Sequence, residues 1–356
     1  MKKSAIFIVI VFCVFELSCT TPEERIPKHS IPTSSGYGML FIGDMMFEWA
    51  VKDTIERYGA EYPLKKIKPF FQSFDFVMAN LESPLTHNRT SLINQKYIFK
   101  ASPLKAFVVA EAGITAVTLA NNHMLDYGST GLLDTLTSLS DAKVLYAGAG
   151  KNETTASLPI LHKLGTTRIA VLCYTQIASK EMIAKNNPGV NFFELKKAQE
   201  DIKKYRFCDS VIISIHWGNE YFYYPSSKQI DLAHALIDAG ADAVIGHHPH
   251  VYQGIEIYKN KPVVYSLGNF LFGSMHEGIN DNIACALYMS GNGKIIKMHI
   301  YAIKGIYNDG IIQPEVLEGE RAAKVFDHVL EISKPLGIIF TSRTAKHHNY
   351  SEFIFR

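Results

Sequence analysis

From residue 38 onward, continuous apolar runs alternate with stretches in which apolar residues recur at helical spacing. Continuous apolar runs are typical of strands buried on both faces, and the spaced pattern is typical of amphipathic helices. The predicted strands are Met39–Ile42, Phe76–Ala79, Ala116–Leu119, Val211–Ile215 and Ala243–Ile245. The predicted helices are Leu64–Phe71, Pro103–Ala112, Gly131–Leu139, Leu195–Tyr205 and Lys228–Ala239. This alternation predicts an α/β fold around a largely buried sheet.

Other pairs of apolar segments are separated by turn-forming residues and predict hairpins. The flanking segments are Leu158–Leu164 with Arg168–Tyr174, Ile255–Tyr258 with Val263–Ser266, and Ile283–Met289 with Ile295–Ile303. Hairpins added to strand–helix units predict two packed sheets with helices outside. A helix over Arg321–Lys334 is expected to close the fold.

The N-terminal segment has a different pattern. Two lysines precede the apolar run Ala5–Phe15, which is too short for a membrane-spanning helix and has the form of a secretory signal. Its end at Cys19 resembles a bacterial lipobox, although Glu16 stands where an aliphatic residue is usual. We predict a lipoprotein-type signal peptide over residues 1–19, with lipidation at Cys19; a plain signal peptide and an uncleaved anchor are the alternatives.

The remaining chain is predicted to be a short tether followed by one domain. Residues 20–36 place prolines among polar residues and predict a flexible tether. Residues 37–356 show no internal repeat and no linker, so we predict a single domain there.

Composition narrows the function. The chain has 356 residues, of which 47% are hydrophobic and 20% charged, as in ordinary globular proteins. Its formal net charge of +2 gives no basic field, so we expect no nucleic-acid binding. Cys173, Cys208 and Cys285 form no close pair and are interpreted as small buried residues rather than disulfides or zinc ligands.

Side chains suited to metal binding follow each of the five predicted strands. In chain order they are Asp44, Glu82, Asn122 with His123 and Asp126, His216 with Glu220, and the loop His247-His248-Pro249-His250. Because the carboxyl ends of strands in an open α/β sheet meet at one edge, we expect these groups to lie together. Mixed carboxylate, amide and imidazole groups suit Zn, Mn or Fe better than Ca or Mg.

The histidine loop is the most distinctive of these segments. Pro249 fixes its own φ and favours an extended conformation for His248, so the loop can present two imidazoles at a fixed spread. Neutral imidazole is the commonest protein metal ligand. A solvated histidine-rich loop without a ligand is the alternative.

As an ordered set, these motifs resemble the CapA family. The motifs are Gly43-Asp44-Met45-Met46, Asn80-Leu81-Glu82, Asn121-Asn122-His123 with Asp126 and Gly128, His216 through Tyr221, Gly246 through Gly254, and Tyr265 through Phe270. CapA proteins are bacterial capsule proteins associated with poly-γ-glutamate synthesis and are related in fold to the calcineurin-like metallophosphoesterases. The resemblance runs from about Met39 to about Phe272. It implies a four-layer αββα sandwich with the site at the sheet edge.

The resemblance also implies roles for individual residues. The implied ligands of one or two divalent transition-metal ions are Asp44, Glu82, Asn122, His216, His248 and His250. His123 corresponds to the histidine that protonates or steadies the leaving group, and Asp126 is expected to orient it. Glu220 and Tyr221 are candidates for substrate contact, with a solvated loop as the alternative.

Met46 departs from the Asp-x-His motif of ordinary phosphoesterases. A thioether is a weak ligand for Zn or Mn, so one metal position is expected to be weakened. CapA-type sequences share this methionine, which therefore is a property of the family.

Three functions stay open. The first is an envelope-anchored CapA-type protein that supports synthesis or export of an anionic polymer such as poly-γ-glutamate, together with other polymer-synthesis proteins. It would be held by its lipid on the periplasmic or surface side of a bacterial membrane. The second is a secreted metal-dependent hydrolase of a phosphoester or amide, and the third is a non-catalytic binding module with a vestigial site.

Overall fold

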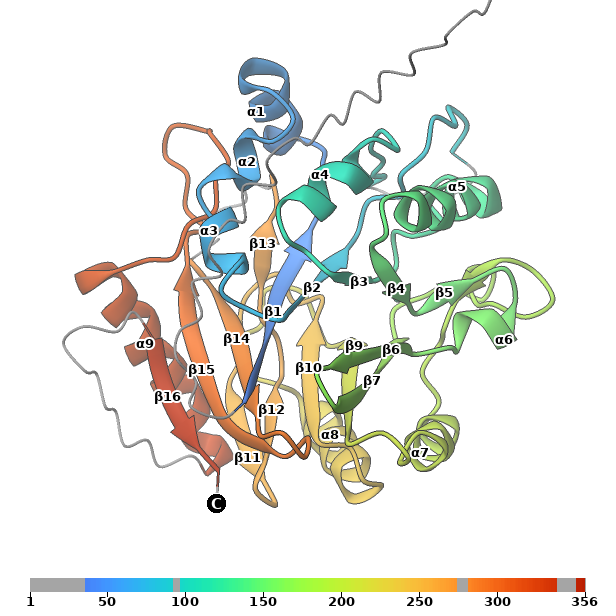
Figure 1. Cartoon of the computed structure of the whole chain (residues 1–356). Coiled ribbons are helices and arrows are strands. Elements are labelled where there is room, and N and C mark those ends of the chain that lie inside the picture. Colours follow the sequence, from blue (N-terminus) through green and yellow to red (C-terminus); the bar gives the residue numbers. More distant parts are fainter. Residues whose placement is uncertain (1–35, 92–96, 274–280, 338–349, 356) are drawn as a thin grey trace, which may run out of the picture.

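The apolar runs form two stacked β-sheets in the computed structural model, which describes residues 36–91, 97–273, 281–337 and 350–355 (Figure 1). The first sheet has the order β16-β15-β14-β1-β2-β3-β4, with β13 beside β1; the second has the order β11-β12-β10-β9-β7-β6. The strands of the first sheet are β1 (Tyr37–Met45), β2 (Phe76–Leu81), β3 (Ala116–Thr118), β4 (Leu145–Ala147), β13 (Asn269–Leu271), β14 (Asn282–Met289), β15 (Ile295–Ile303) and β16 (Tyr350–Ile354). Those of the second are β6 (Ile160–Leu164), β7 (Thr167–Thr175), β9 (Ser210–His216), β10 (Ala243–His247), β11 (Ile255–Tyr258) and β12 (Lys261–Val264). A small pair, β5 (Ala149–Gly150) and β8 (Gly189–Val190), lies apart from both.

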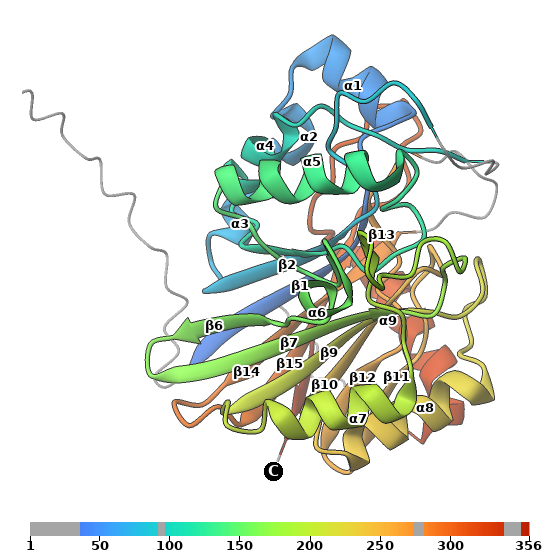
Figure 2. The ribbon, with the colours of Figure 1, turned by 90° about the vertical axis from the view of Figure 1, so that its right-hand side faces the viewer.

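Helices cover the outer face of each sheet (Figure 2). Those over the first sheet are α1 (Ala50–Tyr58), α2 (Tyr62–Lys65), α3 (Lys68–Phe71), α4 (Lys105–Glu111) and α5 (Gly128–Asp141). Those over the second are α7 (Leu195–Lys204) and α8 (Ser227–Asp238). The short α6 (Glu153–Ala156) packs on β5 and β8, and α9 (Gly319–Ser333), followed by a 3₁₀ turn at Lys334–Leu336, packs on β15 and β11.

The alternation of side chains along each strand explains the layers. In β1, Leu40 and Ile42 pack against the outer helices, whereas Met39 and Phe41 face the second sheet. Successive residues of a strand point to opposite faces, so a continuous apolar run can serve two cores at once. The result is the four-layer αββα sandwich that the pattern and the motifs predicted.

The five predicted strands and three predicted hairpins are confirmed, with two differences in detail. The predicted helix Leu64–Phe71 is two short helices, α2 and α3, because Pro69 lacks the N–H that a continuous helix would need. The turn between β11 and β12 contains only Lys259 and Asn260, both with positive φ, as a tight two-residue hairpin requires. The pattern did not predict α1 or β16.

An irregularity in strand pairing lies at the end of β1. Where β1 pairs with β2, the register shifts between Phe41 and Asp44. Such irregularities often re-aim a side chain next to a functional site.

Cys19 and the rest of the predicted signal peptide lie outside the described residues. The predictions made for them stay untested.

Gly246 allows close packing directly before the histidine loop. A Cβ atom there would lie 1.9 Å from Tyr265 O and 2.6 Å from Trp217 Nε1, two atoms that are themselves hydrogen-bonded at 2.9 Å. We expect Gly246→Ala to lower the free energy of unfolding by about 1–3 kcal/mol, because the core must shift to admit one methyl group. Urea unfolding measures this. Gly291→Ala is the control, since no atom lies within 4 Å of the added Cβ and stability should not change.

Candidate metal centre

The carboxyl ends of β1, β2 and β9 bring one group of ligand-type side chains together. Asp44, Glu82 and His216 are buried, and each offers a ligand atom within 4.8 Å of the others. These three residues come from both sheets, so the two sheets share this edge. The structure therefore brings together three of the six predicted ligands at a single point.

A second group comes from the loops after β9 and β10. Glu220, His248 and His250 offer ligand atoms within 4.8 Å of one another, with Glu220 exposed and both histidines buried. Asp44 links the two groups, because its Oδ2 accepts a hydrogen bond from the His248 backbone N–H (3.2 Å) and lies 3.4 Å from His250 Nδ1. The arrangement offers one shared carboxylate between two potential ion positions.

Asn80 is a site residue to which sequence reasoning gave no role. Its Nδ2 donates to Asp44 Oδ1 (2.8 Å) and Glu82 Oε1 (2.9 Å), and lies 3.2 Å from His216 Nδ1. Asn121 Nδ2 donates to Asn80 Oδ1 (3.0 Å) and thereby orients the amide. The spacing of Asn80 and Glu82 could have indicated this role. Residues two apart on a strand share a face, and Asn80 precedes Glu82 by two.

Asn122, the predicted amide ligand, contacts the first group through His216. Its Oδ1 lies 2.8 Å from His216 Nε2. This pair joins the loop after β3 to the end of β9. His247 is buried nearby, with Nδ1 3.3 Å from Asp44 Oδ1 but without the geometry of a hydrogen bond.

The backbone of the histidine loop differs from the expectation. His248 has φ 98° and His250 has φ 59°, so His248 is not extended as Pro249 had suggested. Tertiary contacts hold the loop in this shape: the His248 N–H bonds Asp44, and the Tyr221 N–H donates to Pro249 O at 2.7 Å. Tyr221 itself has φ 64°. Backbone strain of this kind is often concentrated at functional sites.

His123 and Asp126 form a buried pair beside these groups. His123 Nδ1 lies 3.0 Å from Asp126 Oδ2, which also accepts the Phe99 N–H at 2.8 Å. The Phe99 ring lies 4.2 Å from the imidazole, centroid to centroid. This packing fixes the ring and leaves Nε2 as the atom available for proton transfer. The predicted orientation of His123 by Asp126 agrees with this geometry.

The pKa values of the two buried carboxyl groups, Glu82 and Asp44, are shifted in opposite directions. Burial raises the pKa of Glu82 well above its usual range, and the charge of Asp44 raises it further. Burial also acts to raise the pKa of Asp44, but contacts with His247 and His250 outweigh it and hold that pKa well below the usual range. Two buried carboxyl groups this close repel each other when both are ionised. A divalent cation would relieve that repulsion.

The pKa values of the two histidines in the Glu220–His248–His250 group are also shifted in opposite directions. Burial and the charge of His250 lower the pKa of His248 to about 3, so its imidazole is neutral, as a metal ligand must be. Burial also acts to lower the pKa of His250, but the contact with Asp44 and the charge of Glu82 outweigh it and bring the pKa to about 9. Without metal, His250 thus carries positive charge toward the two carboxyl groups.

Met46 does not point a free thioether at either group. It is fully buried, packs with Phe99 and Phe272, and its Sδ lies 3.1 Å from the Glu48 backbone N–H. Where ordinary phosphoesterases have a histidine, this chain has an apolar contact. The predicted weakening of one metal position follows from this chemistry and stays a prediction.

Glu220 and Tyr221 lie at the exposed border of the site. Tyr221 is 38% exposed, and its ring centroid lies 6.1 Å from that of His250. The Phe272 ring lies 4.7 Å from that of His250, centroid to centroid, and Trp49 makes edge contacts with Tyr97, Phe99 and Phe272. The predicted substrate contacts of Glu220 and Tyr221 stay a prediction.

Comparison with known proteins connects the motifs to a family. The model of the family described as "Bacterial capsule synthesis protein PGA_cap" matches residues 38–274, a span that contains both ligand groups and the His123–Asp126 pair. The chain belongs to this family. The resemblance to CapA proteins is thereby confirmed.

Relatives with related names support this membership. The chain is 36% identical over 271 residues to the capsule biosynthesis protein CapA of Bacillus anthracis, covering 72% of this chain and 65% of that protein. It is 32% identical over 298 residues to the PGA biosynthesis protein CapA of Bacillus subtilis (strain 168), covering 82% and 78%. The match thus spans just under two thirds of the B. anthracis protein.

Two solved structures show remote similarity to the chain. A hypothetical protein from Thermus thermophilus aligns with a TM-score of 0.45 and 17% identity, covering 79% of this chain and 99% of that one. The sulfate thiohydrolase SoxB of the same species aligns with a TM-score of 0.38 and 13% identity, over 64% of this chain and 38% of the other.

Proposed function

We propose that this protein supports the synthesis or export of an anionic capsule polymer, poly-γ-glutamate, at the bacterial cell envelope. Family membership and the names of the Bacillus relatives support the capsule role. The proposal includes a divalent transition metal bound at the sheet edge. It is supported by the meeting of the Asp44–Glu82–His216 and Glu220–His248–His250 groups there.

The described residues fit a divalent transition metal. Glu82 Oε2 and His248 Nδ1 are buried, and neither has a hydrogen-bond partner within the described part of the chain. Buried polar atoms without partners are costly, and an ion in each group would satisfy Glu82 Oε2 in the first and His248 Nδ1 in the second. The donor set of carboxylate and imidazole suits Zn, Mn or Fe. The residues that would hold the ions are Asp44, Glu82, Asn122, His216, His248 and His250, with Glu220 as a further donor.

A second candidate function, hydrolysis of a phosphoester or amide, is favoured by the His123–Asp126 pair. A metal ion in such a site lowers the pKa of bound water and polarises an electrophilic centre. Asp126 holds His123 through Nδ1, so Nε2 can deliver a proton to a leaving group. Phe99 excludes water from one face of that imidazole. The hydrolysis would then be the step through which the protein acts on the polymer or its precursor.

The capsule role is tested in a strain of the source organism that lacks the gene. We expect envelope-associated poly-γ-glutamate to fall to background and to return with the wild-type gene. Asp44→Asn should fail to restore it although the variant accumulates normally. Unchanged polymer in the deletion strain would rule out the proposed role.

We further propose that a lipid on Cys19 anchors the protein to a bacterial membrane. Within the described residues, no helix is both long enough and apolar enough to span a bilayer. Cys19→Ser is expected to abolish incorporation of radiolabelled palmitate and to move the protein from the membrane fraction to the soluble one, because the proposed lipid site is lost. Cys208→Ser is the matched control and should leave both unchanged. Labelling of Cys19→Ser at the wild-type level would contradict the anchor.

A further inference from the structure

A hollow with a volume of about 550 Å³ is lined by the segments that follow β1 and β2, the two strands whose ends carry Asp44 and Glu82. Its walls include Phe47 and Glu48 from the segment after β1. On the other side its wall includes Lys100, the neighbour of Phe99, whose ring packs on His123. The hollow is therefore built from the same segments that position the site.

Positive side chains dominate this hollow. Lys52, Arg89, Lys100 and Lys105 contribute four cationic groups to its walls, and we call these four residues the basic pocket. The acidic residues in the same walls are Glu48 and Glu56. The cations come from α1, from the segment after β2 and from the start of α4, so separate parts of the chain converge on one surface.

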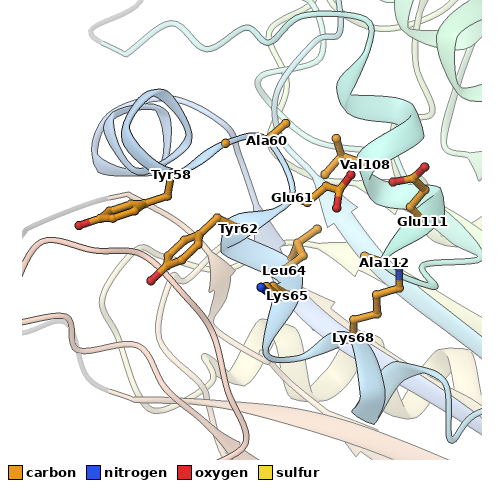
Figure 3. A pocket seen from close by; sticks show the side chains of 11 residues that line it. Tyr58, Ala60, Glu61, Tyr62, Leu64, Lys65, Lys68, Val108, Glu111 and Ala112 are labelled. Carbon is orange, nitrogen blue, oxygen red and sulfur yellow. The ribbon is translucent and has the colours of Figure 1, made fainter.

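A second hollow nearby shows that this imbalance is not general. It has a volume of about 600 Å³ and is lined by two lysines, Lys65 and Lys68, and two glutamates, Glu61 and Glu111 (Figure 3). Its charges balance. The stacked rings of Tyr58 and Tyr62, with centroids 4.6 Å apart, form one of its sides.

The cations of the basic pocket have weak compensation from the protein. Lys105 is half-buried, and burial alone lowers its pKa. Glu48 is an acidic group that faces both Lys52 and Lys100, and its ion pair with Lys52 is long, at 3.9 Å. Lys100 donates to the neutral carbonyl of Asn88 at 3.0 Å and lies over the Tyr127 ring. Lys100 and Lys105 are partly buried, whereas Lys52 and Arg89 are exposed at the border of the hollow, and a polyanion from outside would bring opposite charge to all four.

We propose that the basic pocket binds successive carboxylate groups of the anionic polymer and holds that chain next to the metal centre. This inference rests on the proposed function. A γ-linked glutamate chain presents one carboxylate on each residue, and several cations on separate segments match such a repeating anion better than they match one compact ligand. Arg89 can bind a carboxylate through two parallel hydrogen bonds, while the lysines act as point charges.

Fluorescence anisotropy with a fluorescein-labelled γ-glutamate decamer and the full-length protein tests the proposal. We expect the Arg89→Gln/Lys105→Gln double variant to raise the Kd about tenfold, since each lost charge pair near the surface changes affinity severalfold. Higher salt should weaken wild-type binding, because it screens these charges. Lys65→Gln/Lys68→Gln is the matched control, with the same loss of charge in the balanced hollow, and should change Kd less than about twofold.

Two outcomes would overturn the proposal. One is an equal Kd for the double variant and the wild type; the other is an equal loss in the control variant, which would indicate nonspecific attraction. Competition separates carboxylate from phosphate: glutarate should displace the decamer more effectively than inorganic phosphate at equal ionic strength, and the reverse order would refute the carboxylate assignment.

The cellular experiment distinguishes failure of this inference from failure of the proposed function. If the double variant binds the decamer normally and restores the polymer in the deletion strain, the pocket assignment is wrong while the capsule role stands. If the deletion strain makes normal polymer, the capsule role is wrong, and a tenfold weaker decamer affinity of the double variant would still support a carboxylate-binding pocket.

Discussion

His250→Ala is expected to lower the affinity for a divalent transition metal by at least about 100-fold. Substitutions in the outer shell of metal sites already cost roughly 10–100-fold, and His250 belongs to the ligand group itself. His250 also contacts Asp44 and Asn269, so its loss disturbs the carboxylate that both groups share. Purified protein loaded with Zn²⁺ or Mn²⁺ and then dialysed should retain metal by elemental analysis, whereas the variant should not.

Thermal unfolding gives a second reading of the same change. Metal at about 100 times its Kd stabilises a protein by about 2.7 kcal/mol, so the wild type should melt at a higher temperature with metal and the variant should not respond. His162→Ala is the control, because His162 lies on β6 against Phe76, away from the strand ends. Equal metal content in His250→Ala and the wild type would show that the ligand assignment is wrong.

Asn80 bears on whether one or two ions bind. Its amide nitrogen donates to Asp44 and Glu82 and lies 3.2 Å from His216 Nδ1, so Asn80 contacts all three residues of the first group. In the Glu220–His248–His250 group, the Asn269 amide contacts His250 alone of the three among the described hydrogen bonds, and His248 Nδ1 lacks a partner there. The second group is therefore the better candidate for the stronger position.

The location of the site followed from the sequence because two simple patterns agreed. Continuous apolar runs identified the buried strands, and each run ended in polar side chains, as at Asp44 and His216. Parallel strands such as β9 and β10 place their carboxyl ends side by side. The meeting of these ends can therefore be predicted although the loop conformations are not known.

Other features depend on tertiary contacts that no local pattern specifies. The positive φ of His248 results from its bond to Asp44, a residue 204 positions away. The packing of Phe99 on His123 likewise joins distant segments. The helix α1 begins after Trp49, which has φ 54° and no side-chain cap, so the usual signal for a helix start is missing.

His123→Ala is expected to reduce metal-dependent turnover of an aryl phosphate by roughly 10²–10⁴-fold, the usual contribution of a positioned general acid. Metal content should remain at the wild-type level, because His123 belongs to neither ligand group. Asp126→Asn should cause a smaller loss, since Phe99 still packs on the imidazole but the carboxylate that holds Nδ1 is gone. Steady-state kinetics of the metal-loaded proteins measures both effects.

The comparison between these variants separates catalysis from binding. A general acid matters most for a poor leaving group, so the loss in His123→Ala should shrink when the phenol is replaced by one of lower pKa, such as para-nitrophenol. A purely structural role for His123 would reduce turnover of all leaving groups equally. Equal turnover in His123→Ala and the wild type, or a wild-type protein that binds metal without any turnover, would favour a metal-containing binding module. In such a module, Met46 and the apolar packing around it take the place of the histidine ligand of ordinary phosphoesterases.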